Sequence, residues 1–147
     1  MSEQNFKNHA RYVPLYHFIT STIIAALIIA AGICLIKVCS NCTNHQDLHN
    51  SLMFFLISMV LLFIWWYCRV FALKAQDRAI RAEENFRHFV ATGKPLDRRL
   101  KMGQIVALRF AGDDEFVTLA KKAVEENMDA KAIKMAIKNW KADNERV

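Results

Sequence analysis

The fold of this chain is decided by LYHFITSTIIAALIIAAGICLI, residues Leu15–Ile36, together with SLMFFLISMVLLFIWWYC, residues Ser51–Cys68. Neither apolar stretch contains Asp, Glu, Lys or Arg, and each has at least 18 residues. A helix of that length crosses a hydrocarbon core of about 30 Å, whereas a buried helix of a soluble protein seldom needs such a run. The sequence therefore predicts an all-α membrane protein with a two-span transmembrane helical hairpin.

The charges around these stretches predict the orientation of the hairpin. Lys7 and Arg11 precede the first stretch, and seventeen Lys and Arg against twelve Asp and Glu follow Cys68. Residues 38–50, between the stretches, contain no Lys or Arg. Because cytoplasmic segments next to spans carry the excess of positive charge, both termini are expected in the cytoplasm. A cleaved signal peptide is not expected, since the first stretch exceeds the roughly 7 to 15 residues of a signal core.

The second span is expected to continue beyond the membrane. No Gly or Pro occurs from Arg69 to Ala91, so the helix should extend as a cytoplasmic stalk until Thr92–Pro95 ends it. The expected segments are a cytoplasmic interfacial N-terminus at 1–14, transmembrane helix 1 at 15–37, an extracytoplasmic loop at 38–50, transmembrane helix 2 with its cytoplasmic continuation at 51–91, and a small C-terminal domain at 96–143.

The C-terminal domain is predicted to contain three helices. Gly112 separates the first two, and the acids that follow it suit the positive end of a helix. Such a small domain has little core of its own, so packing against the long helix should help it. The expected helices are Asp97 to Ala111, Asp113 to Asn127, and a third that is capped by Asp129 and reaches Trp140.

A row of lysines marks the third predicted helix, opposite its apolar face. An ordinary solvated face is the simplest interpretation, and anionic lipid headgroups beside the membrane are the second. Nucleic-acid phosphates are a weaker alternative, because base readout favours Arg, Asn or Gln at the leading turn, where this helix has Asp129, Ala130 and Lys131. Acidic protein surfaces remain a further possibility. The row consists of Lys131, Lys134, Lys138 and Lys141.

Two other helical patterns bear on packing. Small side chains line one face of the first span, which would suit either contact within the hairpin or a groove for a foreign helix. An apolar stripe on the stalk needs cover from the C-terminal domain or from another protein. Ion pairs one turn apart, Asp77 with Arg81 and Glu83 with Arg87, should support the stalk. The small face comprises Thr22, Ala26, Ala30 and Cys34, and the stripe comprises Phe71, Ala75, Ala79, Ala82, Phe86 and Phe89.

Four residues in and beside the predicted loop have ligand-like spacing. Two thiolates and two imidazoles could close a tetrahedral zinc site, but only two residues separate the two ligand pairs, and a disulfide or free thiols are the simpler explanation. Haem between the spans is not expected, because His17 has no histidine opposite it at the cytoplasmic end of the second span. We therefore expect no metal and no cofactor. The four residues are Cys39, Cys42, His45 and His49.

Several segments together carry a family resemblance. They are Arg69–Glu84 (RVFALKAQDRAIRAEE), Gln4–His9 with Pro14–His17, Gln104–Ala111, and Ala136–Trp140. With these segments the chain resembles a family of short two-span bacterial membrane proteins known only as a domain of unknown function. The resemblance implies a protein of the bacterial cytoplasmic membrane with two spans and a helical tail, and it brings no activity with it.

No enzyme is predicted, because no nucleophile with a positioned base and no phosphate-cradling glycine loop is evident. We expect a non-catalytic accessory or scaffolding subunit that binds another integral membrane protein or a second copy of itself. The alternatives are a membrane-tethered binder of nucleic acid or anionic lipid through the basic C-terminal helix, and a metal or redox site in the Cys/His loop. Polar groups held near the interface by a rigid helix are the expected contacts: Asn5, His9, Lys74, Asp77, Arg78 and Arg81.

Overall fold

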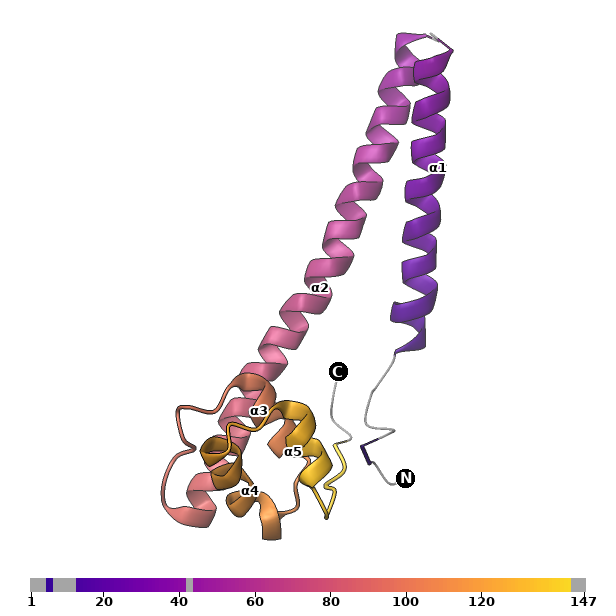
Figure 1. Ribbon diagram of the computed structural model, residues 1–147. Coiled ribbons are helices and arrows are strands. Elements are labelled where there is room, and N and C mark those ends of the chain that lie inside the picture. The colour runs from indigo at the N-terminus through magenta and orange to yellow at the C-terminus, as the bar shows by residue number, and fades with distance from the viewer. Residues whose placement is uncertain (1–4, 7–12, 42–43, 144–147) are drawn as a thin grey trace. The chain divides into compact units, whose positions relative to one another are not determined.

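The computed structural model describes residues 5–6, 13–41 and 44–143, and their regular structure is helical apart from one backbone bridge between Ala111 and Trp140 (Figure 1). The described residues form two compact units, one of residues 13–41 and 44–71 and one of residues 5–6 and 72–143. The elements are a π-helical segment η1 (Leu15–Thr20), α1 (Ser21–Ser40), α2 (His45–Thr92), α3 (Met102–Leu108), α4 (Asp113–Glu125) and α5 (Ala130–Ala136).

Two helices are long and apolar enough to cross a membrane, namely η1 with α1 at Leu15–Ser40, and α2. Within the first unit they run side by side in opposite directions (Figure 1). The hydroxyl of Tyr16 donates a hydrogen bond of 2.6 Å to the carbonyl of Trp65, and the two rings stack with centroids 5.4 Å apart. Leu15, Ile36 and Phe54 are each about two-thirds exposed. The outer faces of this hairpin are therefore apolar and uncovered.

The connection between the two helices is shorter than the sequence led us to expect. The predicted loop at 38–50 is mostly helical, because α1 continues to Ser40 and α2 already begins at His45. The side chain of Asn44 accepts a hydrogen bond of 3.0 Å from the backbone N–H of Gln46, which satisfies a donor at the start of α2. The polar residues that suggested a loop instead form the first turns of the helix.

The small face of α1 is not the face that meets α2. Thr22, Ala26, Ala30 and Cys34 are all exposed, so their expected contact within the hairpin does not occur. Gly32 lies on the inner side, where an added Cβ would stand 4.0 Å from the Phe55 ring. The inner face has heptad-like spacing and combines large apolar residues with the small Ala31 and Gly32. The less exposed residues of α1 are Ser21, Ile24, Ile28, Ala31, Gly32, Leu35 and Val38.

The C-terminal domain packs against the second half of α2, as its small size led us to expect. Ile80 of α2 is 4% exposed and belongs to one apolar cluster with residues of α3, α4 and α5. Leu108, Phe110, Phe116 and Ile133 have the largest fully buried side chains of that cluster. Burial of a large apolar side chain contributes about 1.5–3 kcal/mol, so this shared core holds the three short helices on α2.

The first helix of the domain is shorter than predicted. Asp97 to Ala111 was expected, but α3 spans only Met102–Leu108. Asp97 accepts hydrogen bonds from the backbone and guanidinium of Arg99, which favours a turn over a helix. The side chain of Gln104 then caps α3 by accepting a 2.6 Å hydrogen bond from the N–H of Lys101.

The third helix also ends early, at Ala136 rather than near Trp140. Its start is as predicted, since Asp129 accepts a 2.6 Å hydrogen bond from the N–H of Ala132. The N–H groups of Lys138 and Asn139 donate to the Glu115 carboxylate at 3.1 and 2.9 Å, which draws the chain out of the helix. The second helix agrees with its prediction, with α4 at Asp113–Glu125.

Candidate interaction surface

The part of α2 beyond Ala72 has two faces with different surroundings. One face lies against the C-terminal domain and carries the buried Ile80 and Glu84. The other face carries the members of the apolar stripe from Ala75 to Phe89, and each of these is exposed, with Phe86 68% and Phe89 52% exposed. The domain therefore leaves Phe86 and Phe89 uncovered, although Ala82 lines a pocket together with the segment that leads into α3. A neighbouring exposed Val90 widens the apolar surface.

Arg87 ties the domain to α2. Its Nη1 lies 3.1 Å from Glu84 on the same helix, and its Nε donates a 2.7 Å hydrogen bond to Asp113 at the start of α4. Its Nη2 donates to the carbonyl of Ala111 at 2.7 Å. The guanidinium carbon also stands 4.1 Å from the centre of the Phe116 ring. The arginine fork is thus held by four groups, and its side chain is only 15% exposed.

Neither of the two ion pairs that were predicted along the stalk is present in the described part of α2. Arg87 pairs with Glu84 and Asp113, not with Glu83. Among the ion pairs of residues 44–143, Asp77 with Arg81 does not occur. The Arg87 guanidinium holds the pKa of Asp113 below its ordinary value, mainly through the hydrogen bond and then through its charge. Arg87 was predicted to stabilise the stalk by pairing with Glu83, but instead it connects α2 to α4 of the C-terminal domain.

The predicted contact residues do not all share one environment. Lys74, Arg78 and Arg81 are exposed on α2, on the side of the apolar stripe that also carries Asn85. Asp77 is half-buried and lines a small hollow against α3 with Val106 and Phe110. Asn5 is exposed, and His9 lies outside the described residues. The three cations of α2 are thus brought together, whereas Asp77 turns toward the domain.

The predicted lysine row is divided by the early end of α5. Lys131 and Lys134 belong to α5, while Lys138 and Lys141 lie in the non-helical segment after it. The ammonium of Lys134 stands 5.5 Å from the centre of the Phe110 ring, so part of the row is engaged inside the domain. The continuous basic helix face that favoured nucleic acid or anionic lipid is absent from the described residues 130–143.

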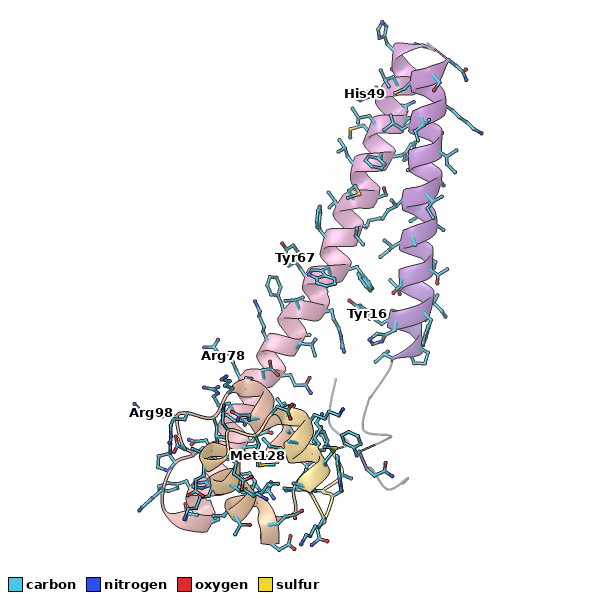
Figure 2. The ribbon with its side chains drawn as sticks, in the orientation of Figure 1. Tyr16, His49, Tyr67, Arg78, Arg98 and Met128 are labelled. Atoms are coloured by element: carbon cyan, nitrogen blue, oxygen red, sulfur yellow. The ribbon has the colours of Figure 1, made fainter. Side chains whose placement is uncertain are left out.

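The four possible ligands of the loop are not brought together as a set in what the structure describes. Cys39 is exposed near the end of α1, and His45 and His49 are one turn apart at the start of α2, where Figure 2 labels His49. Cys42 lies outside the described residues. No group of three or more potential metal ligands occurs among the residues the structure describes.

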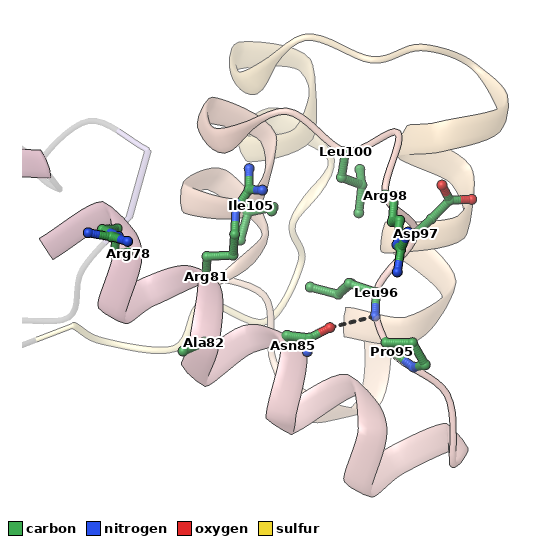
Figure 3. A pocket seen from close by; sticks show the side chains of 10 residues that line it. All are labelled: Arg78, Arg81, Ala82, Asn85, Pro95, Leu96, Asp97, Arg98, Leu100 and Ile105. Atoms are coloured by element: carbon green, nitrogen blue, oxygen red, sulfur yellow. Dashed lines mark hydrogen bonds between the residues drawn. The ribbon is translucent and has the colours of Figure 1, made fainter. Parts of the chain in front are cut away.

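Sequence reasoning missed two residues of this region. Arg98 lines the same pocket as Arg78 and Arg81 but comes from a separate segment (Figure 3), seventeen positions from Arg81 in the chain. Gln104 is 7% exposed and joins α3 to the turn before α5 by donating a 2.7 Å hydrogen bond to the carbonyl of Met128. The sequence offered one signal for the role of Gln104, namely a polar residue within an apolar helix face, which indicates a buried hydrogen bond.

A family model, described as a family of unknown function (DUF6526), matches residues 1–147. No curated protein and no solved structure matches the chain.

Proposed function

Since the chain belongs to this family of unknown function (DUF6526), whose description carries no activity, we propose a role from the structure: a non-catalytic accessory or scaffolding subunit of the bacterial inner membrane. In this proposal η1, α1 and the first half of α2 cross the bilayer as a hairpin, with both termini in the cytoplasm. The second half of α2 presents the C-terminal domain and the apolar stripe to a partner in a membrane protein complex.

The exposed hairpin supports the membrane part of the proposal. Both helices carry large apolar side chains on their outer faces, such as Ile29 at 63%, Phe54 at 67% and Trp66 at 58% exposure. Soluble proteins rarely leave contiguous apolar surfaces of this extent open to water. A bilayer would cover them, and the absence of Asp, Glu, Lys and Arg from residues 51–68 fits that cover.

The observation that carries the partner part is the uncovered stripe on α2. The domain packs on the opposite side of the helix, so Phe86 and Phe89 have no cover from the described chain even though they extend beyond the predicted span. Exposed phenylalanines and the exposed cations Lys74 and Arg78 lie along the same helix, and a surface that combines aromatic and charged side chains is typical of protein interfaces. The occupant is another integral membrane protein or a second copy of the chain.

A photo-crosslinking amino acid placed at Phe86 tests this proposal in native membranes. We expect a discrete crosslinked product that survives high salt, and mass spectrometry then identifies the partner. A product of twice the chain mass would identify the partner as a second copy. The matched control places the same amino acid at Lys121, whose side chain is 77% exposed on α4. Equal crosslinking from both positions, or none from Phe86, would contradict the proposal.

A further inference from the structure

A pocket of about 640 Å³ lies between the basic side of α2 and the segment that leads from Pro95 into α3 (Figure 3). All of it belongs to the C-terminal unit. Its rim carries three arginines, Arg78 and Arg81 from α2 and Arg98 from the facing segment. Its floor is apolar and consists of Ala82, Pro95, Leu96, Leu100 and Ile105.

The pocket wall is fastened in place. The Asn85 side chain accepts a 2.9 Å hydrogen bond from the N–H of Leu96, as the dashed line in Figure 3 shows. Leu96 is 8% exposed and Leu100 is 4% exposed, so both anchor the segment in the domain core. Arg98 is therefore carried by a backbone that is pinned on both sides.

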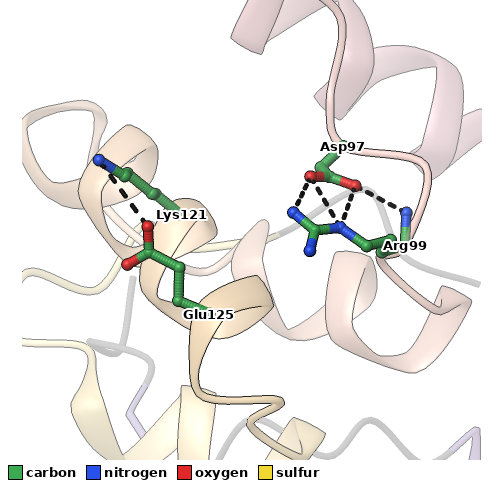
Figure 4. Close-up of polar contacts among 4 residues, drawn as sticks. All are labelled: Asp97, Arg99, Lys121 and Glu125. Atoms are coloured by element: carbon green, nitrogen blue, oxygen red, sulfur yellow. Dashed lines mark hydrogen bonds and ion pairs between the residues drawn. The ribbon is translucent and has the colours of Figure 1, made fainter.

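The one acid among the lining residues is already engaged. Asp97 accepts hydrogen bonds from Arg99 Nη2 at 2.8 Å, from its Nε at 3.1 Å and from its backbone N–H at 2.9 Å (Figure 4). These bonds also hold the pKa of Asp97 at about 2, so the carboxylate stays ionised and committed to Arg99. Asp97 therefore does not neutralise the positive charge of the three arginines at the rim.

The three rim arginines have no carboxylate partner within the described part of the chain. The ion pairs of residues 44–143 involve Arg87, Arg99, Arg109, Lys121 and Lys122, and none involves Arg78, Arg81 or Arg98. Arg78 and Arg81 are three residues apart on one helix, where like charges repel. An anion in the pocket would relieve this repulsion.

We propose that this pocket binds a phosphate-bearing anion, with Arg81 and Arg98 holding the phosphate oxygens, Arg78 adding positive charge at the outer end of the rim, and the apolar floor receiving the rest of the ligand. The planar guanidinium group binds phosphate through two parallel N–H donors, so arginines match a phosphate better than lysines would. The phosphate comes from a soluble phosphorylated compound or from the headgroup of an anionic lipid. This binding does not depend on the proposed partner, because it concerns the isolated chain.

Titration of the full-length protein in a neutral detergent tests the proposal. One arm uses inorganic pyrophosphate in isothermal titration calorimetry, and the other uses short-chain phosphatidylglycerol against short-chain phosphatidylcholine. We expect saturable binding in at least one arm, and the double variant Arg81→Gln/Arg98→Gln should weaken it at least tenfold. Pyrophosphate binding would identify a soluble source, and selective phosphatidylglycerol binding alone would identify a lipid source.

The controls separate the pocket from general basic charge. Lys121→Gln removes an exposed cation of α4 outside the pocket and should leave binding unchanged. Arg81→Lys keeps the charge without the guanidinium fork and should give intermediate affinity. Circular dichroism confirms that each variant folds, and the replaced arginines are exposed, so the core stays intact. Absence of binding in both arms, or an equal loss in Lys121→Gln, would overturn the proposal.

Discussion

The guanidinium carbon of Arg87 lies 4.1 Å from the centre of the Phe116 ring, so one side chain of the long helix α2 covers the largest buried aromatic of α4. The same guanidinium bonds to Asp113 at the first residue of α4. The position of the C-terminal domain on α2 is therefore fixed by a cation that is nearly buried, and the apolar stripe on the other side of α2 remains open.

Removal of Arg87 should loosen the domain. Arg87→Ala leaves Glu84 without its partner at 8% exposure, and the loss of a buried, hydrogen-bonded charge costs about 2–4 kcal/mol. Arg87→Lys should recover only part of this stability, since an ammonium cannot reproduce the guanidinium fork.

Hydrogen exchange of the α4 amides measures the change in stability. Lys121→Ala, which removes an exposed pair with Glu125 (Figure 4), should cost less than about 0.5 kcal/mol. Equal effects of Arg87→Ala and Lys121→Ala would show that Arg87 does not hold the C-terminal domain on α2.

The two glycines of the domain should respond to alanine in opposite directions. A Cβ on Gly112 would stand 3.1 Å from the backbone oxygen of Asn139, which also accepts the Gly112 N–H at 2.8 Å and has little room to move. Gly112→Ala should therefore destabilise the domain by about 1–3 kcal/mol. In α3, the Cβ of Gly103→Ala would meet only Ala130 at 3.9 Å, and the helix should gain about 0.5–1 kcal/mol. Urea unfolding followed by circular dichroism measures both changes. A stabilising Gly112→Ala would contradict the close contact between the added Cβ and the Asn139 oxygen.

Acid should weaken the domain through Asp97 and Asp113. Arg99 holds the pKa of Asp97 at about 2, and Arg87 holds the pKa of Asp113 below its ordinary value. A carboxyl with a lowered folded pKa contributes stability above its unfolded pKa of about 3.9, and that contribution is lost as the pH falls through the folded value. The unfolding free energy should thus decline between about pH 4 and pH 2.

The double variant Asp97→Asn/Asp113→Asn provides the comparison for this acid effect. It should be less stable than the native chain at neutral pH and should decline less between pH 4 and pH 2, because the two linked carboxyls are gone. Hydrogen exchange of core amides at several pH values measures both slopes. Identical slopes would show that neither pair contributes to folding.

The inner and outer faces of α1 should differ in their tolerance of bulk. Gly32→Leu places a large side chain toward the Phe55 ring and should lower the thermal midpoint of the detergent-solubilised protein. Ala26→Leu adds a side chain on an exposed face and should leave the midpoint unchanged. The reverse order of the two effects would place the small face inside the hairpin, which is one of the two interpretations that the sequence allowed.

Sequence and structure agree where local signals decide the outcome. The two apolar helices follow from long runs without Asp, Glu, Lys or Arg, and the start of α5 follows from the cap at Asp129. The acids at Asp113–Glu115 likewise mark the start of α4. Each of these features depends on residues within a few positions of one another, and such features can be predicted from a single chain.

The misses come from contacts between distant positions. The early end of α5 depends on Glu115, which captures backbone N–H groups more than twenty positions away. Arg87 chooses Asp113, twenty-six positions away, over its neighbour Glu83. The pocket could not be predicted for the same reason, since the segment that carries Arg98 is held beside α2 by the hydrogen bond from the backbone of Leu96 to Asn85. The helical spacing of residues in the sequence does not indicate which residues far apart in the chain will contact one another.

The proposal of a membrane hairpin with a cytoplasmic domain is tested most directly by labelling single cysteines in spheroplasts. One variant keeps only Cys39, and the other has Phe89→Cys as its sole cysteine. We predict that a membrane-impermeant maleimide labels Cys39 in intact spheroplasts but labels position 89 only after lysis. Labelling of position 89 from outside, or recovery of the protein in the aqueous fraction without detergent, would contradict the proposal.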